Sequence, residues 1–339
     1  MRWSSSQTLI TGVYRSGTEY LSQLLSGHPR LSCTMYHVNA LRFVLNRYEP
    51  LGERKNLDRA LADMNARLGK RYGLSVDADR VIDRMSSSGF SNWAGLYDAV
   101  MSELWLGEQK EHWAEKCQLV WREIPQFLRE MPNGKAILLI RDPRSVTASF
   151  QRFTHAPAPA YLGAVFNSLD ALQHAMKFQE TLDPARFAAV RYEDLASDPE
   201  RETARLYKFL GLDPSEARLD PTSWIGETGQ KWASNSSFSN GARFDVAASI
   251  KRWRDNLDPI DRGFVEAICK GAMEHWRYDS FGPPADWPEI LRRVLPDANL
   301  TMMLRLALVN GEGTQAFPTD PVDPANWDFS RRVPPAART

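Results

Sequence analysis

The chain is poor in cysteine, with Cys33, Cys117 and Cys269 as the only three among 339 residues. Three scattered thiols exclude a disulfide framework and a cysteine-rich zinc site, and they indicate buried thiols in a reducing compartment. No segment reaches the roughly 20 consecutive apolar residues of a membrane helix. The N-terminal MRWSSSQTLITGV also lacks a long apolar stretch before a cleavage site. We therefore expect a cytoplasmic protein with no signal peptide and no membrane span.

The chain also has no excess of charge of either sign, with 42 basic and 42 acidic residues. This balance gives no indication of a nucleic-acid partner, and we expect none, although a local basic cluster can still bind a small anion. Hydrophobic residues make up 43% of the chain and charged residues 25%. Such a mixture is typical of a globular protein.

Strand-like and helical segments alternate along the chain. Residues 8–13 (TLITGV) are apolar and β-branched, which predicts a buried strand, and residues 18–26 carry apolar side chains at helical spacing. Further strands are predicted at 136–140 (AILLI) and 187–190 (FAAV). This alternation predicts an α/β fold with a central parallel sheet flanked by helices.

Two regions depart from the alternation. Residues from about 51 to 130 have mostly helical patterns, and we interpret them as a helical insertion that shapes an acceptor pocket. Residues 283–339 contain nine prolines and form a Pro-rich extension that is expected to wrap the surface or to be partly disordered. We place the main domain at residues 1–282.

The first predicted strand leads into a glycine loop, GVYRSGT, at residues 12–18. Its glycines have the spacing of a Walker A loop, but Thr18 stands where that loop has lysine, and the cation is Arg15 instead. Backbone amides at the start of the following helix can still bind an anion. The changed cation favours a smaller anion held without magnesium, and Arg15 can neutralise charge on a leaving oxygen. The alternative is an ordinary strand-loop-helix corner.

A second basic segment, RDPRSVTAS, follows the strand at 136–140. Arg141 stands at the carboxyl end of that strand, where α/β sheets bind ligands. Ser149 comes about two helical turns later and can face the same site. An arginine and a hydroxyl suit a terminal phosphate dianion. Arg144 is expected to pair on the surface, and the alternative for Arg141 is an ion pair with a neighbouring carboxylate.

These segments resemble the PAPS-dependent sulfotransferase superfamily (PAPS is 3'-phosphoadenosine-5'-phosphosulfate), chiefly its bacterial and Golgi-type branches. YRSGTEYLSQLLSGHP is similar to the family's 5'-phosphosulfate loop and helix, and LLIRDPRSVTASF to its 3'-phosphate motif. VRYEDL, NSSF and SIKRWRDNL follow in the family's order, so that the resemblance covers about residues 7–279. It implies a P-loop-like sulfotransferase fold and in-line transfer of a sulfuryl group from PAPS to a hydroxyl or amine, with PAP as product and no metal.

The resemblance also implies residue roles. The phosphosulfate would be held by Arg15, Ser16, Gly17, Thr18 and Glu19. The 3'-phosphate would be held by Arg141 and Ser149. Tyr192 would lie near the adenine, and Ser249, Arg252 and Trp253 would close over the nucleotide. Lys116 would lie beside the reacting centre. Two departures are notable. Glu19 replaces a usual threonine, so its carboxylate should point away or pair, and Cys117-Gln118 replace residues that include a catalytic histidine in the cytosolic branch.

The catalytic base is therefore open. His37 is the first candidate because it follows the first helix on the expected acceptor side, and its alternative is a hydrogen-bonded core histidine. Glu115 is the second, followed by His112 and His155. The sequence does not choose a carbohydrate, a lipid or a small metabolite as acceptor. Competing functions are a P-loop kinase or NTPase, which would need magnesium, and a non-catalytic PAP- or nucleotide-binding module.

Overall fold

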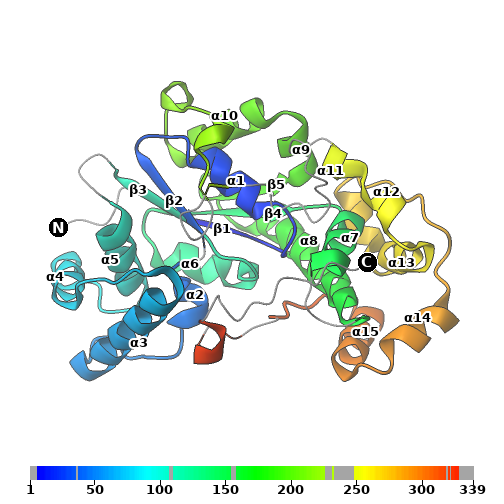
Figure 1. The fold of residues 1–339 in the computed structure, drawn as a ribbon, viewed down its shortest axis with the longest axis horizontal. Helices are drawn as coiled ribbons and strands as arrows, with labels where there is room; N and C mark the ends of the chain where they lie inside the picture. Colours follow the sequence, from blue (N-terminus) through cyan, green and yellow to red (C-terminus); the bar gives the residue numbers. More distant parts are fainter. Residues whose placement is uncertain are drawn as a thin grey trace.

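A single parallel sheet organises the protein. The computed structural model describes residues 6–35, 37–106, 110–153, 158–225, 231–232, 248–317, 320 and 322–327. Within them five strands follow the order β2-β3-β1-β4-β5 (Figure 1). They are β1 (Ser6–Gly12), β2 (Leu31–Met35), β3 (His112–Lys116), β4 (Gly134–Ile140) and β5 (Phe187–Arg191). Lys116 is in register with Ile10, and Arg191 with Ile140, so the carboxyl ends of neighbouring strands meet at one edge. The predicted α/β class is confirmed.

Helices cover both faces of the sheet (Figure 1). On one face Ile10 and Leu139 share a buried cluster with Leu21 of α1 and Leu206 of α10, while α5, α6 and α8 contact the strands on the other face. The longer helices are α1 (Thr18–Leu25), α3 (Arg54–Tyr72), α4 (Ala78–Ser88), α5 (Trp93–Trp105), α6 (Ile124–Glu130), α7 (Pro143–Phe153), α8 (Gly163–Thr181), α10 (Pro199–Leu210), α13 (Pro259–His275), α14 (Trp287–Val294) and α15 (Ala298–Asn310). The shorter α-helices are α2 (Ala40–Phe43), α9 (Tyr192–Ser197), α11 (Ala248–Lys251) and α12 (Trp253–Asn256).

The helical region predicted at about 51–130 is interrupted by a strand. Helices α3, α4 and α5 fill it as far as Trp105, but β3 then lies between β2 and β1 near the middle of the sheet. The sequence of β3, HWAEK, looks polar, yet all five residues are buried. Glu115 can be buried there because several donors satisfy its carboxylate, a condition that the local pattern does not reveal.

The chain beyond residue 282 contains two helices and a returning segment. Helix α15 packs on α8. The following residues, which we call the C-terminal strap (311–317, 320 and 322–327), return across the molecule towards α2 (Figure 1). Thr314 donates its amide to the carbonyl of Phe166 at 3.0 Å, and the ring of buried Trp327 lies 6.3 Å from that of Phe43. The strap therefore packs against the main body, as its predicted wrapping suggests, whereas the domain boundary at 282 stays a prediction.

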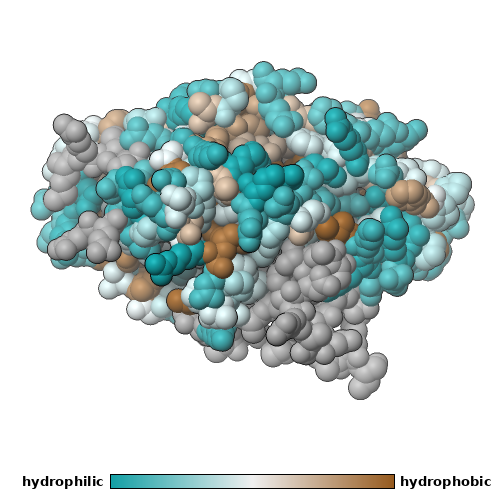
Figure 2. Space-filling view, turned by 90° about the horizontal axis from the view of Figure 1, so that it is seen from above, coloured by the Kyte–Doolittle hydropathy of each residue, from teal (hydrophilic) through white to brown (hydrophobic). Residues whose placement is uncertain are grey.

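The face of the molecule seen in Figure 2 is largely hydrophilic, with separate hydrophobic areas. Among the helices that the structure describes, none is both long enough and apolar enough to cross a bilayer.

Candidate active site

The glycine loop closes tightly at the carboxyl end of β1. Gly17 precedes α1 with a φ of +99°, and a Cβ there would lie 2.3 Å from a ring carbon of Tyr192. A Cβ on Gly12 would lie 2.5 Å from the carbonyl oxygen of Leu139. Ser16 is buried between them and donates its amide to the carbonyl of Val13 at 3.1 Å. The close approach of neighbouring atoms therefore requires glycine at both positions. The loop also places the start of α1 at the edge of the sheet, and no side-chain hydrogen bond caps that helix at Gly17.

Arg15 joins the two basic segments that the sequence singles out. Its Nε donates to Ser149 Oγ at 3.0 Å across 134 residues of sequence, and its backbone has a φ of +71°. A non-glycine residue in this region stores strain of about 1–3 kcal/mol and is common at functional sites. Burial, together with the nearby charge of Arg141, lowers the pKa of Arg15 to about 10. The site thus concentrates positive charge that an anionic ligand would stabilise.

Arg141 completes this arrangement from the end of β4. Its Nη1 donates to the carbonyl of Arg15 at 2.9 Å and its Nη2 to that of Ser249 at 3.0 Å. Its Nε is buried and makes no hydrogen bond within the described part of the chain. The alternative pairing of Arg141 with Asp142 does not occur, because Asp142 is bound by Arg144. We call residues 12–18, Arg141 and Ser149 the anion cradle.

Tyr192 supports the cradle from beneath. Its ring lies against Gly17, with the guanidinium of Arg141 4.2 Å from the ring centroid, and its hydroxyl is 2.6 Å from Ser249 Oγ. Only 3% of Tyr192 is exposed. The structure therefore gives Tyr192 a packing role, while its contact with an adenine stays a prediction.

The segment at residues 249–253 lies over the cradle. Besides the contact between Ser249 and Arg141, the carbonyl of Ile250 accepts from Ser145 Oγ at 3.4 Å. Trp253 is buried, with Arg144 packed on its ring, so it faces the core. Arg144 forms ion pairs as expected, but the expectation that it does so on the surface is wrong, because that residue is only 2% exposed. Arg252, the other residue predicted here, is half-buried.

The first turn of α1 carries two further contacts. Trp232 Nε1 donates to Glu19 Oε1 at 2.7 Å, so the Glu19 carboxylate pairs with an indole. Gln118 Nε2 donates to Thr18 Oγ1 at 3.2 Å, which brings the loop after β3 to the glycine loop. Sequence reasoning did not select Gln118. Its position two residues after Lys116 at a strand end is the signal that could have identified it.

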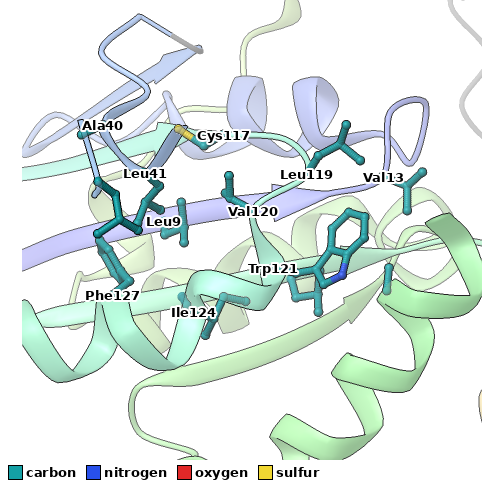
Figure 3. Close-up of a cluster of buried hydrophobic side chains, with 14 of the residues drawn as sticks. Leu9, Val13, Ala40, Leu41, Cys117, Leu119, Val120, Trp121, Ile124 and Phe127 are labelled. Atoms are coloured by element: carbon teal, nitrogen blue, oxygen red, sulfur yellow. The ribbon is translucent and has the colours of Figure 1, made fainter. Parts of the chain in front are cut away.

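The loop after β3 is fixed against β1. The amides of Cys117 and Leu119 donate to the carbonyls of Ile10 and Gly12 at 2.8 and 3.2 Å. Figure 3 shows Leu119, Val120 and Trp121 in one apolar cluster with Val13. Lys116, buried at the carboxyl end of β3, is therefore held at the same edge as the glycine loop.

The candidate bases occupy very different places. Glu115 is fully buried, accepts from the amides of Val38 and Asn39 and from Tyr97 and Cys117, and has a pKa raised by burial. The ring of His37 packs between Tyr72 and Trp105 at centroid distances of 4.5 and 5.1 Å. His112 pairs in register with Ser6 and Leu31 at the amino edge of the sheet, away from the cradle, so it is wrong as a base. His155 lies outside the described residues.

A cavity of about 390 Å³ lies between α2 and the C-terminal strap. Arg42, which is only 7% exposed, has its guanidinium 4.1 Å from the ring centroid of Phe317. At the rim, Arg47 Nη2 pairs with Asp320 Oδ1 at 3.4 Å. The lining residues are Leu41, Arg42, Leu45, Asn46, Arg47, Glu123, Phe317 and Asp320. The cavity thus combines fixed donors and acceptors with an aromatic wall, as small-molecule sites do.

No group of three or more histidine, cysteine, aspartate or glutamate side chains among the described residues could hold a metal ion.

Comparison with known proteins gives one family. The model of the sulfotransferase family matches residues 8–216, which include the whole anion cradle. Carbohydrate sulfotransferase 1 of Danio rerio is 23% identical over 334 residues, covering 82% of this chain and 79% of that protein. Omega-hydroxy-beta-dihydromenaquinone-9 sulfotransferase Stf3 of Mycobacterium bovis is 34% identical over 107 residues, covering 28% of each chain.

Among solved structures, the sulfotransferase domain from the curacin biosynthetic pathway superimposes with a TM-score of 0.51 at 19% identity. The superposition covers 81% of this chain and 98% of that domain. At this identity the similarity supports the fold alone.

Proposed function

Because the chain belongs to the sulfotransferase family, we propose that its anion cradle binds PAPS and that the enzyme transfers the sulfuryl group to a carbohydrate hydroxyl. One observation carries the donor half of this proposal. Arg15 and Arg141, from two strand ends, are brought together at a buried place where the pKa of Arg15 falls to about 10. A phosphate dianion would stabilise both charges, which is how buried cations are normally satisfied.

Each part of the cradle then has a task. The amides at the start of α1 and the side chain of Thr18 would hold the 5'-phosphosulfate, and Ser149 and Arg141 the 3'-phosphate. PAPS would supply the sulfuryl group. Arg15 now donates to Ser149 and would turn towards the phosphosulfate, where it can neutralise charge on the bridging oxygen. Lys116 at the end of β3 would add a second cation at the same edge.

The base is proposed as His37 rather than Glu115. The carboxylate of Glu115 is held by two backbone amides at the start of α2 and by Tyr97, so its contacts are those of a structural acceptor. His37 is half-buried just beyond the end of β2, and histidine is the most common general base in enzymes. The transfer assay below, repeated on His37→Gln, should show a lower kcat with unchanged affinity for PAP.

The donor proposal is tested by calorimetric titration with PAP, and with ATP in the presence and absence of magnesium. PAP should bind tightly with no metal added, because the cradle offers cations and amides in place of a magnesium site. Transfer from PAPS to a sugar, followed by mass spectrometry, then establishes turnover. A preference for magnesium-ATP would contradict the proposal, and PAP binding without transfer to any acceptor would reduce the protein to a nucleotide-binding module.

The acceptor half of the proposal draws on the cavity between α2 and the C-terminal strap. Its lining includes guanidinium, amide and carboxylate groups as well as the ring of Phe317, and sugars offer many hydroxyls that can both donate and accept. A relative that matches 82% of this chain is named carbohydrate sulfotransferase 1. A lipid hydroxyl is the second candidate, because the local match to Stf3 is the stronger one in identity.

Replacing Arg42 by methionine should raise the KM for the sugar acceptor about tenfold or more and leave the affinity for PAP unchanged. The substitution removes the buried donors of the cavity while keeping the bulk of the side chain. Initial rates over a panel of neutral mono- and disaccharides and of long-chain alcohols give the measurement. Arg59→Met is the matched control, because Arg59 also lies over an aromatic ring, that of Tyr48 at 5.2 Å, but does not line the cavity. Equal effects of both variants would contradict the assignment of the cavity.

A further inference from the structure

Arg144, three residues after Arg141 of the cradle, is a buried cation with several partners. Its Nε and Nη2 donate to Asp142 at 3.0 and 2.8 Å. Its Nη1 donates to Glu266 Oε1 at 2.7 Å and to the carbonyl of Asp279 at 2.6 Å. Its guanidinium also lies 4.0 Å from the ring centroid of Trp253. Arg144 in α7 is thus contacted by α12, α13 and the segment after α13, all more than a hundred residues away in sequence.

Trp253 is the member of this cluster that leads back to the cradle. It is 4% exposed and follows directly on the segment whose Ser249 carbonyl accepts from Arg141. At Ser249, the end of the segment away from Trp253, the hydroxyl also forms a hydrogen bond with the hydroxyl of Tyr192. The position of residues 249–252 is thus set at one end by the cradle and at the other by the stacking of Trp253 on Arg144.

We propose that Arg144 is a positioning residue for the nucleotide site: through Trp253 it fixes the segment that brings Ser249 and Arg252 over the donor. Arg144 itself touches no ligand. Its ion pairs with Asp142 and Glu266 hold the guanidinium plane in place, and a fixed plane is what stacking on an indole requires. Asp142 is itself anchored, because its amide donates to Glu193 Oε1 at 3.0 Å. This inference rests on the proposed function for the identity of the ligand.

The test uses two substitutions that leave the ion pairs charged. Arg144→Lys keeps the cation but loses the planar stacking surface, and Trp253→Leu keeps an apolar side chain but loses the ring. Deleting the charge of Arg144 would leave the buried carboxylates of Asp142 and Glu266 without their ion-pair partner and would risk unfolding the protein, so it is avoided. Arg191→Lys is the matched control, since Arg191 lies 4.7 Å from the ring centroid of Tyr278 but has no contact with Trp253.

Two readouts are compared on the full chain. In hydrogen-deuterium exchange without ligand, the peptide covering residues 249–257 should exchange faster in Arg144→Lys and in Trp253→Leu, but not in Arg191→Lys. In calorimetric titration, both variants should bind PAP about tenfold more weakly, and the double variant no more weakly than either single one, because both act through one contact. The KM of the acceptor should not change.

Each outcome decides the inference. Unchanged exchange, or faster exchange with unchanged PAP affinity, would overturn it, and so would equal losses in Arg191→Lys. Additive losses in the double variant would show that Arg144 acts by some other route. If the wild type itself failed to bind PAP, the proposed function would fall, while the exchange data would still decide whether Arg144 fixes residues 249–252.

Discussion

Replacing Arg141 by alanine should weaken PAP binding by about 2 kcal/mol or more, roughly 30-fold. We propose this guanidinium as a contact of the 3'-phosphate, and its buried Nε makes no hydrogen bond within the described part of the chain. Its Nη1 and Nη2 already hold the carbonyls of Arg15 and Ser249, so the substitution also loosens the glycine loop and the overlying segment. Calorimetric titration with PAP at constant salt measures the loss.

The control for this prediction is Arg30→Ala. Arg30 is an arginine of the same chain, exposed and paired with Glu111 at 2.7 Å far from the cradle, so its removal should leave PAP affinity unchanged. Because ion pairing is weakened by salt, the difference between wild type and Arg141→Ala should shrink as ionic strength rises. If the Arg141→Ala protein is folded and binds PAP as tightly as the wild type, the cradle is not the PAP-binding site.

Replacing Gly17 by alanine should have a large effect for a single added methyl group. The new Cβ would need to occupy space 2.3 Å from a ring carbon of Tyr192, and that ring is held by Ser249 and by Arg141. The positive φ of Gly17 adds backbone strain. We expect the free energy of unfolding to fall by about 3 kcal/mol and PAP affinity to fall at least tenfold. Urea unfolding and PAP titration give the two values.

Gly89→Ala distinguishes the backbone strain of a positive φ from the steric overlap of the added Cβ with Tyr192. Gly89 ends α4 with a φ of +76° and has open space where a Cβ would point. Alanine there should cost about 1 kcal/mol of stability, the usual cost of a left-handed backbone, with no change in PAP affinity. Similar losses at Gly17 and Gly89 would mean that the packing of Tyr192 against the loop is unimportant.

The sequence allowed the cradle to be predicted because its parts are local. Arg15 and Arg141 each follow a strongly apolar strand directly, and the carboxyl ends of parallel strands meet at one edge, so short-range patterns were sufficient. The contact between Arg15 and Ser149 then arises from the sheet order, in which β1 and β4 are neighbours.

The features that the sequence did not reveal depend on distant partners. β3 looks polar because Glu115 and Lys116 end it, and only the donors from the β2 loop and from Tyr97 make burial of that carboxylate possible. Arg144 has the local sequence of a surface charge, but Glu266 and Asp279 reach it across more than a hundred residues. Local patterning cannot report such pairs, since their stability comes from the tertiary fold.

The C-terminal strap has a consequence for the order in which the enzyme is built. A chain is synthesised from its N-terminus, and its parts can fold as they emerge from the ribosome. The anion cradle and the segment over it are complete once residue 253 has emerged, but the cavity beside α2 needs Phe317 and Asp320. A nascent chain can therefore assemble its anion cradle before that cavity, which we propose for the acceptor, has its second wall.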